Sequence, residues 1–567
     1  MTTDIRDYLG RELLFYDGGT GTYLQSHGLA AGELPESCNL TCRREMVQMH
    51  ESFLEAGCNI LLTNTFGANP GKLAGSGWEP EELIQAGVEN AREAVRLYRQ
   101  RQGADRPLFV SLDIGPSGRL MKPYGDLSFE EAYEWFRRMA VCGEKAGADL
   151  ITIETMSDSY EVKAAVLAAK ENTSLPVFVT MTFDEGGRLL TGGEVEGTAA
   201  LLAGLGADAI GLNCGLGPHQ MEGLAGKLLA FTDLPVIVNP NAGLPRSENG
   251  RTVYDVGPEE FAGVMERIAR AGAWVLGGCC GTTPEHIRAL TDRLHKMVPV
   301  RRTVKKRTVV TSGSRWIEIG EDPVIIGERI NPTGKKWLKE ALLSGDTDRI
   351  LREAVKEQED GAHILDVNVG LPGLCEAETF AGLIPALQAV TELPLQIDTS
   401  DAAAMERALQ TYNGKAMINS VNGKKESMEA VFPLVKRYGG VVVGLCLDED
   451  GIPDDVDGRL RIARRIIDTA QTYGIGREDI VIDALALTVS AQAGSAAVTL
   501  ETIRRLRQEL QVATVLGVSN ISFGLPAREV INSSFFAMAL AAGLSCGIIN
   551  PGSGAMRDAY DSYRALY

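Results

Sequence analysis

The sequence predicts an α/β protein built from two consecutive (β/α)8 barrels, also called TIM barrels. Short apolar runs, which we interpret as buried strands, alternate with amphipathic stretches of helical periodicity, and each half of the 567 residues contains eight such runs. Eight strand–helix pairs favour a closed parallel barrel, for which about 250 residues is the usual size. An open doubly wound sheet is the competing architecture.

The first eight strands are expected at 13–16, 60–63, 108–112, 150–153, 177–181, 209–212, 236–238 and 274–276. Amphipathic stretches between them include 81–98, 129–146 and 259–271. Several helical stretches run into Ala-Gly just before the next strand, and the glycines Gly57, Gly147 and Gly272 are typical of helix C-termini.

The second eight strands are expected at 324–326, 364–367, 395–397, 416–418, 441–445, 480–482, 514–517 and 546–549. Residues 297–314 are basic and β-branched, end in Ser and Gly, and lack helical periodicity. We therefore expect one domain at 1–296, a linker at 297–314 and a second domain at 315–567. The basic residues of the linker are expected to form a solvated tether, with phosphate binding as the alternative.

Composition and charge exclude several classes of protein. The net charge of −19 argues against a nucleic-acid surface, because phosphate binding requires basic stripes. No apolar stretch approaches the roughly 20 residues that span a bilayer, and the N-terminus lacks the apolar core of a signal peptide. Ten cysteines are too sparse for a disulfide scaffold, so we expect a cytoplasmic protein with free thiols.

Three cysteines follow two predicted strands of the first barrel. Cys214 comes after the strand at 209–212, and Cys279 and Cys280 come after the strand at 274–276. Three thiolates at strand ends form a soft tripod, which is typical of a zinc site with one open position. Such an ion can bind a substrate thiol in its nucleophilic thiolate form. The alternative is that these cysteines only fill space, as free cysteine often does.

Other polar residues follow the remaining strands of the first barrel. The glycine-rich loop at 17–22 exposes backbone N–H groups that can hold a carboxylate, while Asp17 and Glu154 can hold a cationic amine. A thiol, an amine and a carboxylate together describe an amino-acid thiol. His286, near the start of a predicted helix, is expected to be a capping or surface residue.

Four motifs of the first half resemble the homocysteine S-methyltransferase family: 17–22, 63–68, Asn213-Cys214 and Gly-Gly-Cys-Cys-Gly-Thr-Thr-Pro-Glu-His at 277–286. The resemblance implies that Cys214, Cys279 and Cys280 are catalytic zinc ligands that homocysteine sulfur joins. It also implies that Asp17, Gly18 and Glu154 hold the amino-acid end of homocysteine. Asn241, in a strand-end loop, or a water would supply a resting fourth ligand.

Strand ends of the second barrel are rich in carboxylates and amides. The residues are Glu328, Asn331, Asp366, Asn368, Asp398, Asn419, Asp483 and Asn520, with Arg528 and Asn532 further along the segment after the seventh strand. Such a ring suits a flat heterocycle, because a carboxylate can accept two adjacent N–H groups of an aminopyrimidine. Binding of Mg²⁺ by Asp366, Asp398 and Asp483 is the rival interpretation, and loop caps explain single residues.

The second half resembles the pterin-binding family at 326–332, 365–368 and 517–526. The resemblance implies that Asp398, Asn419 and Asp483 bind the pterin ring. Asn520 would lie near N5, whose protonation makes tetrahydrofolate a leaving group. The residues after Asp483 depart from the pattern of cobalamin-dependent methionine synthases, in which Pro commonly follows this Asp.

The order of the two modules is similar to that of cobalamin-dependent methionine synthases. It implies methyl transfer from 5-methyltetrahydrofolate through a corrinoid to zinc-activated homocysteine, giving methionine and tetrahydrofolate. The Asp-x-His-x-x-Gly run of the cobalamin-binding module does not occur in the sequence. We therefore expect either a fragment of a longer enzyme or a subunit that works with a separate corrinoid protein. A corrinoid-dependent methyltransferase with another methyl donor, and a non-catalytic docking scaffold, are the alternatives.

Overall fold

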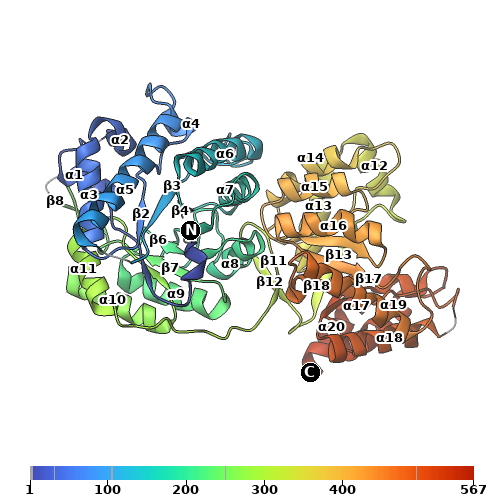
Figure 1. The fold of residues 1–567 in the computed structure, drawn as a ribbon. Helices are drawn as coiled ribbons and strands as arrows, with labels where there is room; N and C mark the ends of the chain where they lie inside the picture. Colours follow the sequence, from blue (N-terminus) through green and yellow to red (C-terminus); the bar gives the residue numbers. More distant parts are fainter. Residues whose placement is uncertain (1–3, 31, 104–105, 249–250, 493) are drawn as a thin grey trace. The chain divides into compact units, whose positions relative to one another are not determined.

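The computed structural model describes residues 4–30, 32–103, 106–248, 251–492 and 494–567. The chain divides into two compact units, Met1–Lys305 and Lys306–Tyr567. Figure 1 shows strands surrounded by helices in each unit. Each unit contains an eight-stranded parallel barrel, so the predicted fold class is confirmed.

The barrel of unit 1 has the strand order β1-β10-β7-β6-β5-β4-β3-β2. A parallel bridge between Tyr16 and Ile60 joins the first strand of this order to the last and closes the ring. Every predicted strand of this half is present. The strands are β1 (Leu14–Phe15), β2 (Ile60–Leu62), β3 (Phe109–Ile114), β4 (Leu150–Met156), β5 (Val177–Met181), β6 (Ala209–Asn213), β7 (Val236–Asn239) and β10 (Val275–Leu276).

Apolar side chains from all eight strands form the core cluster of unit 1. They are Leu14, Ile60, Phe109, Leu150, Phe178, Ala209, Ile237 and Val275. Ile5, in the short helix η1 (Ile5–Asp7), packs against the same cluster. The barrel is therefore a packed core rather than a pore, and chemistry is confined to its rim.

Helices surround the barrel of unit 1, and the predicted stretches 81–98, 129–146 and 259–271 all lie within helices. Gly147 and Gly272 end two of them with φ values of 99° and 117°, as the Ala-Gly signal predicts. The helices are α1 (Thr20–Ser26), η2 (Pro35–Ser37), α2 (Cys38–Thr41), α3 (Arg43–Glu55), α4 (Pro70–Leu73), α5 (Pro80–Gln102), α6 (Phe129–Ala146), α7 (Ser159–Asn172), α8 (Val195–Gly204), α9 (Pro218–Phe231), α10 (Pro258–Ala271) and α11 (Pro284–Leu294).

An antiparallel hairpin interrupts the loop after β7. It consists of β8 (Arg246–Glu248) and β9 (Arg251–Val253), and Arg246 pairs with Val253. An ion pair of 2.8 Å between Arg246 and Asp255 closes its base. This hairpin is not among the predicted strands, because its residues are mostly polar and carry no apolar alternation.

The barrel of unit 2 is closed, and its strands follow one another in chain order. Again, every predicted strand is present. The strands are β13 (Val324–Ile330), β14 (Ile364–Val367), β15 (Leu395–Asp398), β16 (Met417–Asn422), β17 (Val441–Leu445), β18 (Ile480–Asp483), β19 (Ala513–Gly517) and β20 (Cys546–Ile549). Several of the observed strands extend one or more residues beyond the predicted apolar run into the polar residues at their C-terminal ends, which places those residues on the rim.

Helices alternate with these strands around unit 2. They are α12 (Lys336–Ser344), α13 (Thr347–Glu359), α14 (Glu376–Gln388), α15 (Ala402–Thr411), α16 (Lys425–Tyr438), α17 (Val456–Thr472), η3 (Arg477–Asp479), α18 (Ser495–Arg505), the π-helical turn η4 (Leu506–Leu510), η5 (Val518–Ser522), α19 (Arg528–Ala541) and α20 (Gly554–Leu566). Among the helices of the described ranges, none is long and apolar enough to cross a membrane.

A second hairpin precedes the barrel of unit 2. Its strands are β11 (Thr308–Thr311) and β12 (Trp316–Ile319), so β11 lies within the range 297–314 that we predicted as a linker. Val310 and Ile319 are buried in the same core cluster as Val324 and Val441, which begin two barrel strands. The β-branched residues of this segment therefore cover the N-terminal end of the barrel, opposite the rim where the polar residues lie.

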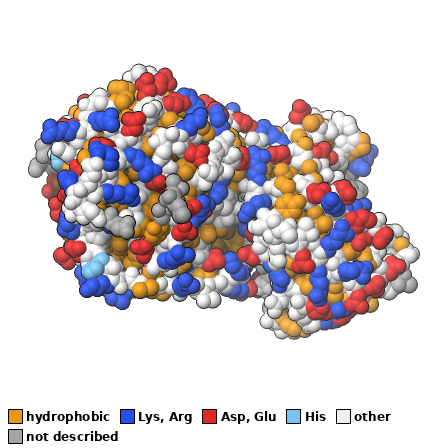
Figure 2. Space-filling model, viewed as in Figure 1, with side chains coloured by type: hydrophobic (Ala, Val, Ile, Leu, Met, Phe, Trp, Pro, Cys, Tyr) orange, Lys and Arg blue, Asp and Glu red, His pale blue; other side chains and the backbone are white. Residues whose placement is uncertain are grey.

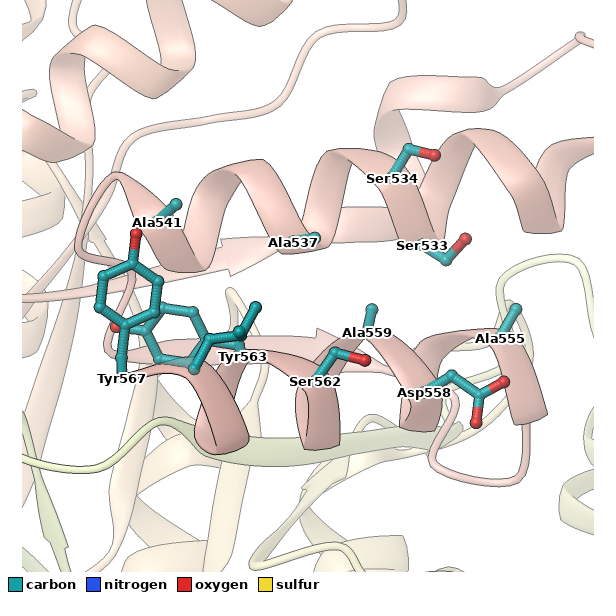
Figure 3. Close-up of a pocket in the computed structure, with 11 residues that line it drawn as sticks. Ser533, Ser534, Ala537, Ala541, Ala555, Asp558, Ala559, Ser562, Tyr563 and Tyr567 are labelled. Atoms are coloured by element: carbon teal, nitrogen blue, oxygen red, sulfur yellow. The ribbon is translucent and has the colours of Figure 1, made fainter.

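Outside the barrel of unit 2, a groove of about 450 Å³ lies between α19 and α20. Figure 3 shows that small side chains, including Ser533, Ala537 and Ala559, line it, with Tyr563 and Tyr567 at one end. None of the candidate site residues contributes to this lining. On the face seen in Figure 2, acidic and basic side chains are interspersed rather than gathered in a basic stripe.

Candidate functional site

The three cysteines of the first barrel meet at the C-terminal rim. Their sulfur atoms all lie within 4.8 Å of one another, and the Sγ atoms of Cys214 and Cys280 are 4.0 Å apart. Backbone hydrogen bonds to the end of β7 and the residue after it hold two of these cysteines in place. Cys214 N–H donates to Asn239 O (3.1 Å), and Cys279 N–H donates to Pro240 O (2.9 Å). Within the described ranges, this is the one group of three or more His, Cys, Asp or Glu side chains with such convergent ligand atoms.

Charge is unevenly distributed among the three thiols. Hydrogen bonds with Cys214 and Cys279, and a smaller contribution from Tyr254, lower the pKa of Cys280 to about 3. Hydrogen bonds with Cys214 and Cys280, followed by burial, raise the pKa of Cys279 well above its ordinary value. Cys280 therefore carries the first negative charge of the cluster, and a cation is needed to hold all three sulfurs as thiolates.

The residues present fit a zinc ion. Three thiolates are the preferred soft ligands of zinc, and a fourth direction stays available for another ligand. Asn241 lies in the loop after β7, only 3% exposed, and its Oδ1 has no hydrogen-bond partner among the described residues. Asn239 Oδ1, close to it in sequence, is likewise buried and unpartnered in the part of the chain that the structure describes. An unpaired buried amide oxygen is costly, so these two oxygens indicate that a ligand or ion belongs here.

Carboxylates lie on the same rim. Asp17 Oδ2 accepts a hydrogen bond from Leu62 N–H (2.9 Å), whereas its buried Oδ1 lacks a partner in the described ranges. Burial raises the pKa of Asp17 well above its ordinary value. Burial, followed by the charge of Cys280, raises the pKa of Glu154 to about 7. A cationic amine placed between Asp17 and Glu154 would offset the cost of burying both carboxylates in their charged form.

Glycine is required where the first loop meets the cysteine loop. A Cβ on Gly18 would lie 2.8 Å from both Phe53 Cε1 and Thr282 Oγ1. The next residue, Gly19, donates its N–H to Thr282 Oγ1 (3.1 Å). The backbone at Gly18 is thereby pressed against the loop that carries Cys279 and Cys280, so a ligand held there reaches both loops.

Four residues of this rim are absent from the predicted set of binding residues. Asn213 donates its amide to Thr155 Oγ1 (2.7 Å) and Glu154 Oε2 (3.4 Å), and so orients that carboxylate. Asp113, at the end of β3, is buried with one oxygen unpartnered among the described residues. Asn213 and Asp113 both follow predicted strands, so their position at a strand end could have identified them as candidate site residues. The other two are Tyr254 and His286. Tyr254 follows the unpredicted hairpin, and His286 forms the expected capping box with Thr283 but is buried rather than exposed.

In the second barrel, Asp398 is the centre of an amide network. Its Oδ2 accepts hydrogen bonds from Asn331 Nδ2 (3.1 Å) and Asn368 Nδ2 (3.0 Å). Burial raises the pKa of Asp398 to about 6 despite these donors. Segments from three strand ends thus contribute to one polar cluster at the rim, and all three residues belong to the predicted set.

Asp366 is buried beneath this cluster and supports it through hydrogen bonds. Gln396 Nε2 donates to its Oδ1 (2.7 Å), and Asn331 Nδ2 approaches its Oδ2 at 3.3 Å. Because both carboxylate oxygens are engaged, Asp366 positions Asn331. Gln396 is a further supporting residue that strand-end position does not reveal, since it lies within an apolar run. The acidic residues do not converge as three Mg²⁺ ligands, because the described residues contain no second cluster of that kind.

Asp483 ends β18 and is supported by a buried arginine. Its Oδ1 accepts the N–H of Leu485 (2.7 Å), and burial raises its pKa to about 7. Arg459, on α17 and 1% exposed, donates to the carbonyls of Ala484 (2.6 Å) and Leu485 (2.9 Å). Arg459 therefore fixes the loop in which this chain departs from the proline-containing pattern, and Leu485 takes a φ of 62° there.

Loops after β13 and β19 complete the second rim. Ser519 Oγ donates to Glu328 Oε1 (3.3 Å), and Arg528 donates to Ser519 O (3.0 Å) while its guanidinium lies 4.7 Å from the Phe523 ring centre. A Cβ on Gly517 would come within 2.8 Å of Asn520 Nδ2, so glycine makes room for the Asn520 side chain. Asn419 lies within β16, and Asn532 Oδ1 is buried without a partner in the described segments.

Each of the two barrels matches the model of a known family. Residues 14–294 match the model of the homocysteine S-methyltransferase family, and residues 327–550 match that of the pterin-binding enzymes. The chain carries a homocysteine S-methyltransferase domain followed by a pterin-binding domain. Both resemblances that the motifs predicted are confirmed.

Curated relatives are similar to this chain along nearly its whole length. Methionine synthase of Mycobacterium tuberculosis (strain ATCC 25618 / H37Rv) is 32% identical over 577 residues, covering 97% of this chain and 48% of the relative. Methionine synthase of Mycobacterium leprae (strain TN) is 32% identical over 585 residues, with the same coverage. The chain thus spans about half the length of the curated relatives it matches. Among solved structures, the metallated homocysteine methyltransferase MmuM from Escherichia coli is 26% identical and covers 50% of this chain and 96% of its own, with a TM-score of 0.45.

Proposed function

We propose that the chain is a methyltransferase that moves a methyl group from 5-methyltetrahydrofolate, through a corrinoid carrier, to homocysteine, giving methionine and tetrahydrofolate. One observation carries the proposal. Three cysteine sulfurs lie within 4.8 Å of one another on the same rim as two buried oxygens, of Asp17 and Asn241, that lack partners among the described residues. A rim of this kind matches an amino-acid thiol, because it offers a place for the sulfur and a place for the amine.

In the homocysteine domain, the substrate would lie across the loops after β1, β4, β6 and β10. Cys214, Cys279 and Cys280 would hold zinc, with Asn241 or a water as the fourth ligand before the substrate arrives. When bound, zinc would keep the homocysteine sulfur as a thiolate near neutral pH. Asp17 and Glu154 would neutralise the ammonium group, and the backbone at Gly18 would bind the carboxylate.

In the pterin-binding domain, Asp398, Asn419 and Asp483 would hold the pterin ring. Asn331 and Asn368 would orient Asp398, and Asp366 would position Asn331. A carboxylate at Asp398 can accept two adjacent pterin N–H groups through its remaining lone pairs. Asn520 would lie near N5, which must gain a proton before tetrahydrofolate can leave. Asp483, whose pKa burial raises to about 7, is poised to exchange a proton at neutral pH. Glu328 and Arg528 would form the rim around the ring.

The corrinoid would be supplied from outside residues 1–567, since the sequence lacks Asp-x-His-x-x-Gly. A tertiary-amine methyl group is a poor electrophile, so a strongly nucleophilic carrier is the natural relay between the two substrates. The same absence is compatible with a separate corrinoid protein and with a further module of a longer chain.

Separate assays of the two half-reactions test the function. The zinc-loaded chain, supplied with free cobalamin and a reductant, should transfer methyl groups from 5-methyltetrahydrofolate to cobalamin and from methylated cobalamin to homocysteine. Cys280→Ser should abolish only the second reaction, and Asp483→Asn only the first. Rapid methionine formation without any corrinoid would overturn the relay. Absence of both half-reactions in the zinc-loaded protein, together with no binding of either substrate, would favour a docking scaffold.

A further inference from the structure

The strand β13, which leads to the rim of the second barrel, contains one residue more than its neighbour. Gly327 pairs with Leu365 and Ile330 pairs with Val367, so three steps along β13 correspond to two along β14. Such an insertion is a β-bulge, which interrupts the ladder and bends the strand. Because side chains alternate between the two faces of a strand, one extra residue moves each later side chain to the opposite face.

The bulge decides which side chains of β13 reach the rim. Ile326 belongs to the buried core cluster of the barrel, so regular alternation would bring Glu328 to the same face and direct Asn331 away from it. Instead, Asn331 donates its amide to Asp398 (3.1 Å) in the polar cluster. Glu328 accepts the hydroxyl of Ser519 (3.3 Å) on the same rim. The extra residue therefore presents both Glu328 and Asn331 to the site.

The helix α13 holds this bulge. Arg329, within the bulge, is in register with no residue of the described strands β14 and β20, and its N–H donates to Oε1 of Glu357 (2.9 Å). A Cβ on Gly327 would lie 2.8 Å from Cδ of Glu357, so the carboxyl group fills the space beside the glycine. Glu353, one turn earlier on α13, accepts a hydrogen bond from Arg329 Nε (2.8 Å). One helix thus fixes both the backbone and the side chain of Arg329.

Glu357 is buried at some cost. Only 1% of it is exposed, and its Oε2 lacks a hydrogen-bond partner among the described residues. Glutamate is rarely buried to this extent unless it has a specific partner. Burial raises the pKa of Glu357 to about 8, so the carboxyl group is mainly uncharged near neutral pH while Oε1 still accepts a hydrogen bond. The N–H of Arg329 is the partner that this buried group serves.

We propose that Glu357 is a positioning residue of the pterin site. It accepts the N–H of Arg329 within the bulge of β13 and so keeps Glu328 and Asn331 turned toward the rim. Glu357 acts on the substrate only through β13. The inference rests on the proposed function in that Glu328 and Asn331 belong to a site for 5-methyltetrahydrofolate.

Glu357→Met is the decisive variant, because methionine has nearly the same length and lacks a strong acceptor oxygen. Glu357→Gln keeps an acceptor oxygen, and Glu359→Met, at an exposed position of the same helix, is the matched control. Calorimetry measures the affinity of the full chain for 5-methyltetrahydrofolate. A group displaced by about 1 Å can cost about 100-fold, and we expect Glu357→Met to lose about 10-fold. Glu357→Gln and Glu359→Met should stay close to the wild type.

A double-mutant cycle separates positioning from a general loss of stability. If Glu357 acts through β13, Glu357→Met should cost clearly less affinity in an Asn331→Ala background than in the wild type, because the group that it positions is already gone. In an Asn419→Ala background, which alters β16 instead, it should keep its full cost. If circular dichroism shows that Glu357→Met does not fold, Glu357→Asp, whose shorter side chain reaches less far toward Arg329, replaces it in the cycle.

The outcomes distinguish this role from the proposed function. Wild-type affinity in Glu357→Met, or an equal cost in the Asn331→Ala and Asn419→Ala backgrounds, would overturn the positioning role and leave the pterin site in place. A loss in Glu357→Gln as large as that in Glu357→Met would also overturn it, because the acceptor oxygen would then not matter. A wild-type chain that does not bind 5-methyltetrahydrofolate would overturn the proposed pterin site and this role with it.

Discussion

The sulfur atoms of Cys214 and Cys280 lie 4.0 Å apart although 66 residues separate them in the chain. Their strands, β6 and β10, are not neighbours, because β7 lies between them in the sheet. Strands two positions apart are separated by roughly 9–10 Å, so the two thiols meet only because the loops bend over the end of β7. Cys214 has a φ of 56°, a conformation that few non-glycine residues adopt, at this bend.

The first prediction concerns the metal. The wild-type chain should bind about one zinc ion, and Cys280→Ala should bind it more than about 100-fold less tightly, beyond the cost of losing an outer-shell partner. Cys375→Ala, which changes an exposed cysteine, is the control. Metal analysis after dialysis against a weak chelator measures both. Full zinc occupancy in Cys280→Ala would contradict the assignment.

Removing the metal should leave the barrel folded. The strand ends that carry the cysteines are already held by backbone bonds to Asn239 and Pro240, so the metal is not needed to build them. Circular dichroism of the metal-free chain should retain its helical signal. Unfolding on chelation would show instead that the zinc is structural.

The second prediction concerns the substrate amine. Glu154→Gln should weaken binding of homocysteine to the zinc-loaded chain by about 10-fold or more, because a buried charge pair would lose one partner. The same variant should bind 4-mercaptobutyrate, which lacks the amine, as well as the wild type does. Calorimetry with both thiols measures the difference. An equal loss for the two ligands would place the amine away from Glu154.

The third prediction concerns the pterin. Asp398→Ala should weaken binding of 5-methyltetrahydrofolate by about 1–3 kcal/mol, the range for leaving hydrogen-bond partners unpaired. The amides of Asn331 and Asn368 would lose their common acceptor at the same time. Asp468→Ala, on the exposed face of α17, is the control. Identical affinities in calorimetry would mean that the pterin binds elsewhere.

The fourth prediction concerns the buried arginine. Arg459→Ala should destabilise the pterin-binding domain by about 3 kcal/mol, because the carbonyls of Ala484 and Leu485 would be left unpaired. It should also weaken binding of 5-methyltetrahydrofolate, since the loop after Asp483 would lose its support. Arg461→Ala, exposed on the same helix, should change neither property. Reduced stability with unaltered pterin affinity would limit Arg459 to a structural role.

The fifth prediction concerns pH. Burial raises the pKa of Asp483 to about 7, whereas an aspartate in the unfolded chain titrates near about 3.9. Between these values the unfolded chain ionises first, so this group lowers stability progressively as the pH rises from about 4 to about 7, and the cost is complete above that range. Asp483→Asn removes the cost. Its Tm should exceed that of the wild type by a few degrees at pH 8, and the difference should shrink toward pH 4.5. A difference in Tm that does not vary with pH would contradict the shifted pKa.

Much of the candidate site was predictable because barrels place function at strand ends. Once strands were assigned from apolar runs, the residues after them, such as Cys214, Asp398 and Asp483, followed directly. Asp366 illustrates the limit of this reasoning. It occupies an equivalent position in sequence, yet both of its carboxylate oxygens are engaged by Gln396 and Asn331, and it supports the site from beneath.

The sixteen barrel strands, the order of the two domains and the three cysteines of the candidate metal site could be read from the chain alone, because periodicity and strand-end position are local properties. Three contacts could be found only in the folded molecule: Tyr254 against Gly281, Arg459 on the loop after Asp483, and β11 across the end of the second barrel. These contacts join segments that are distant in the chain. Their partners are selected by the path of the backbone in space, which no local pattern of residues records.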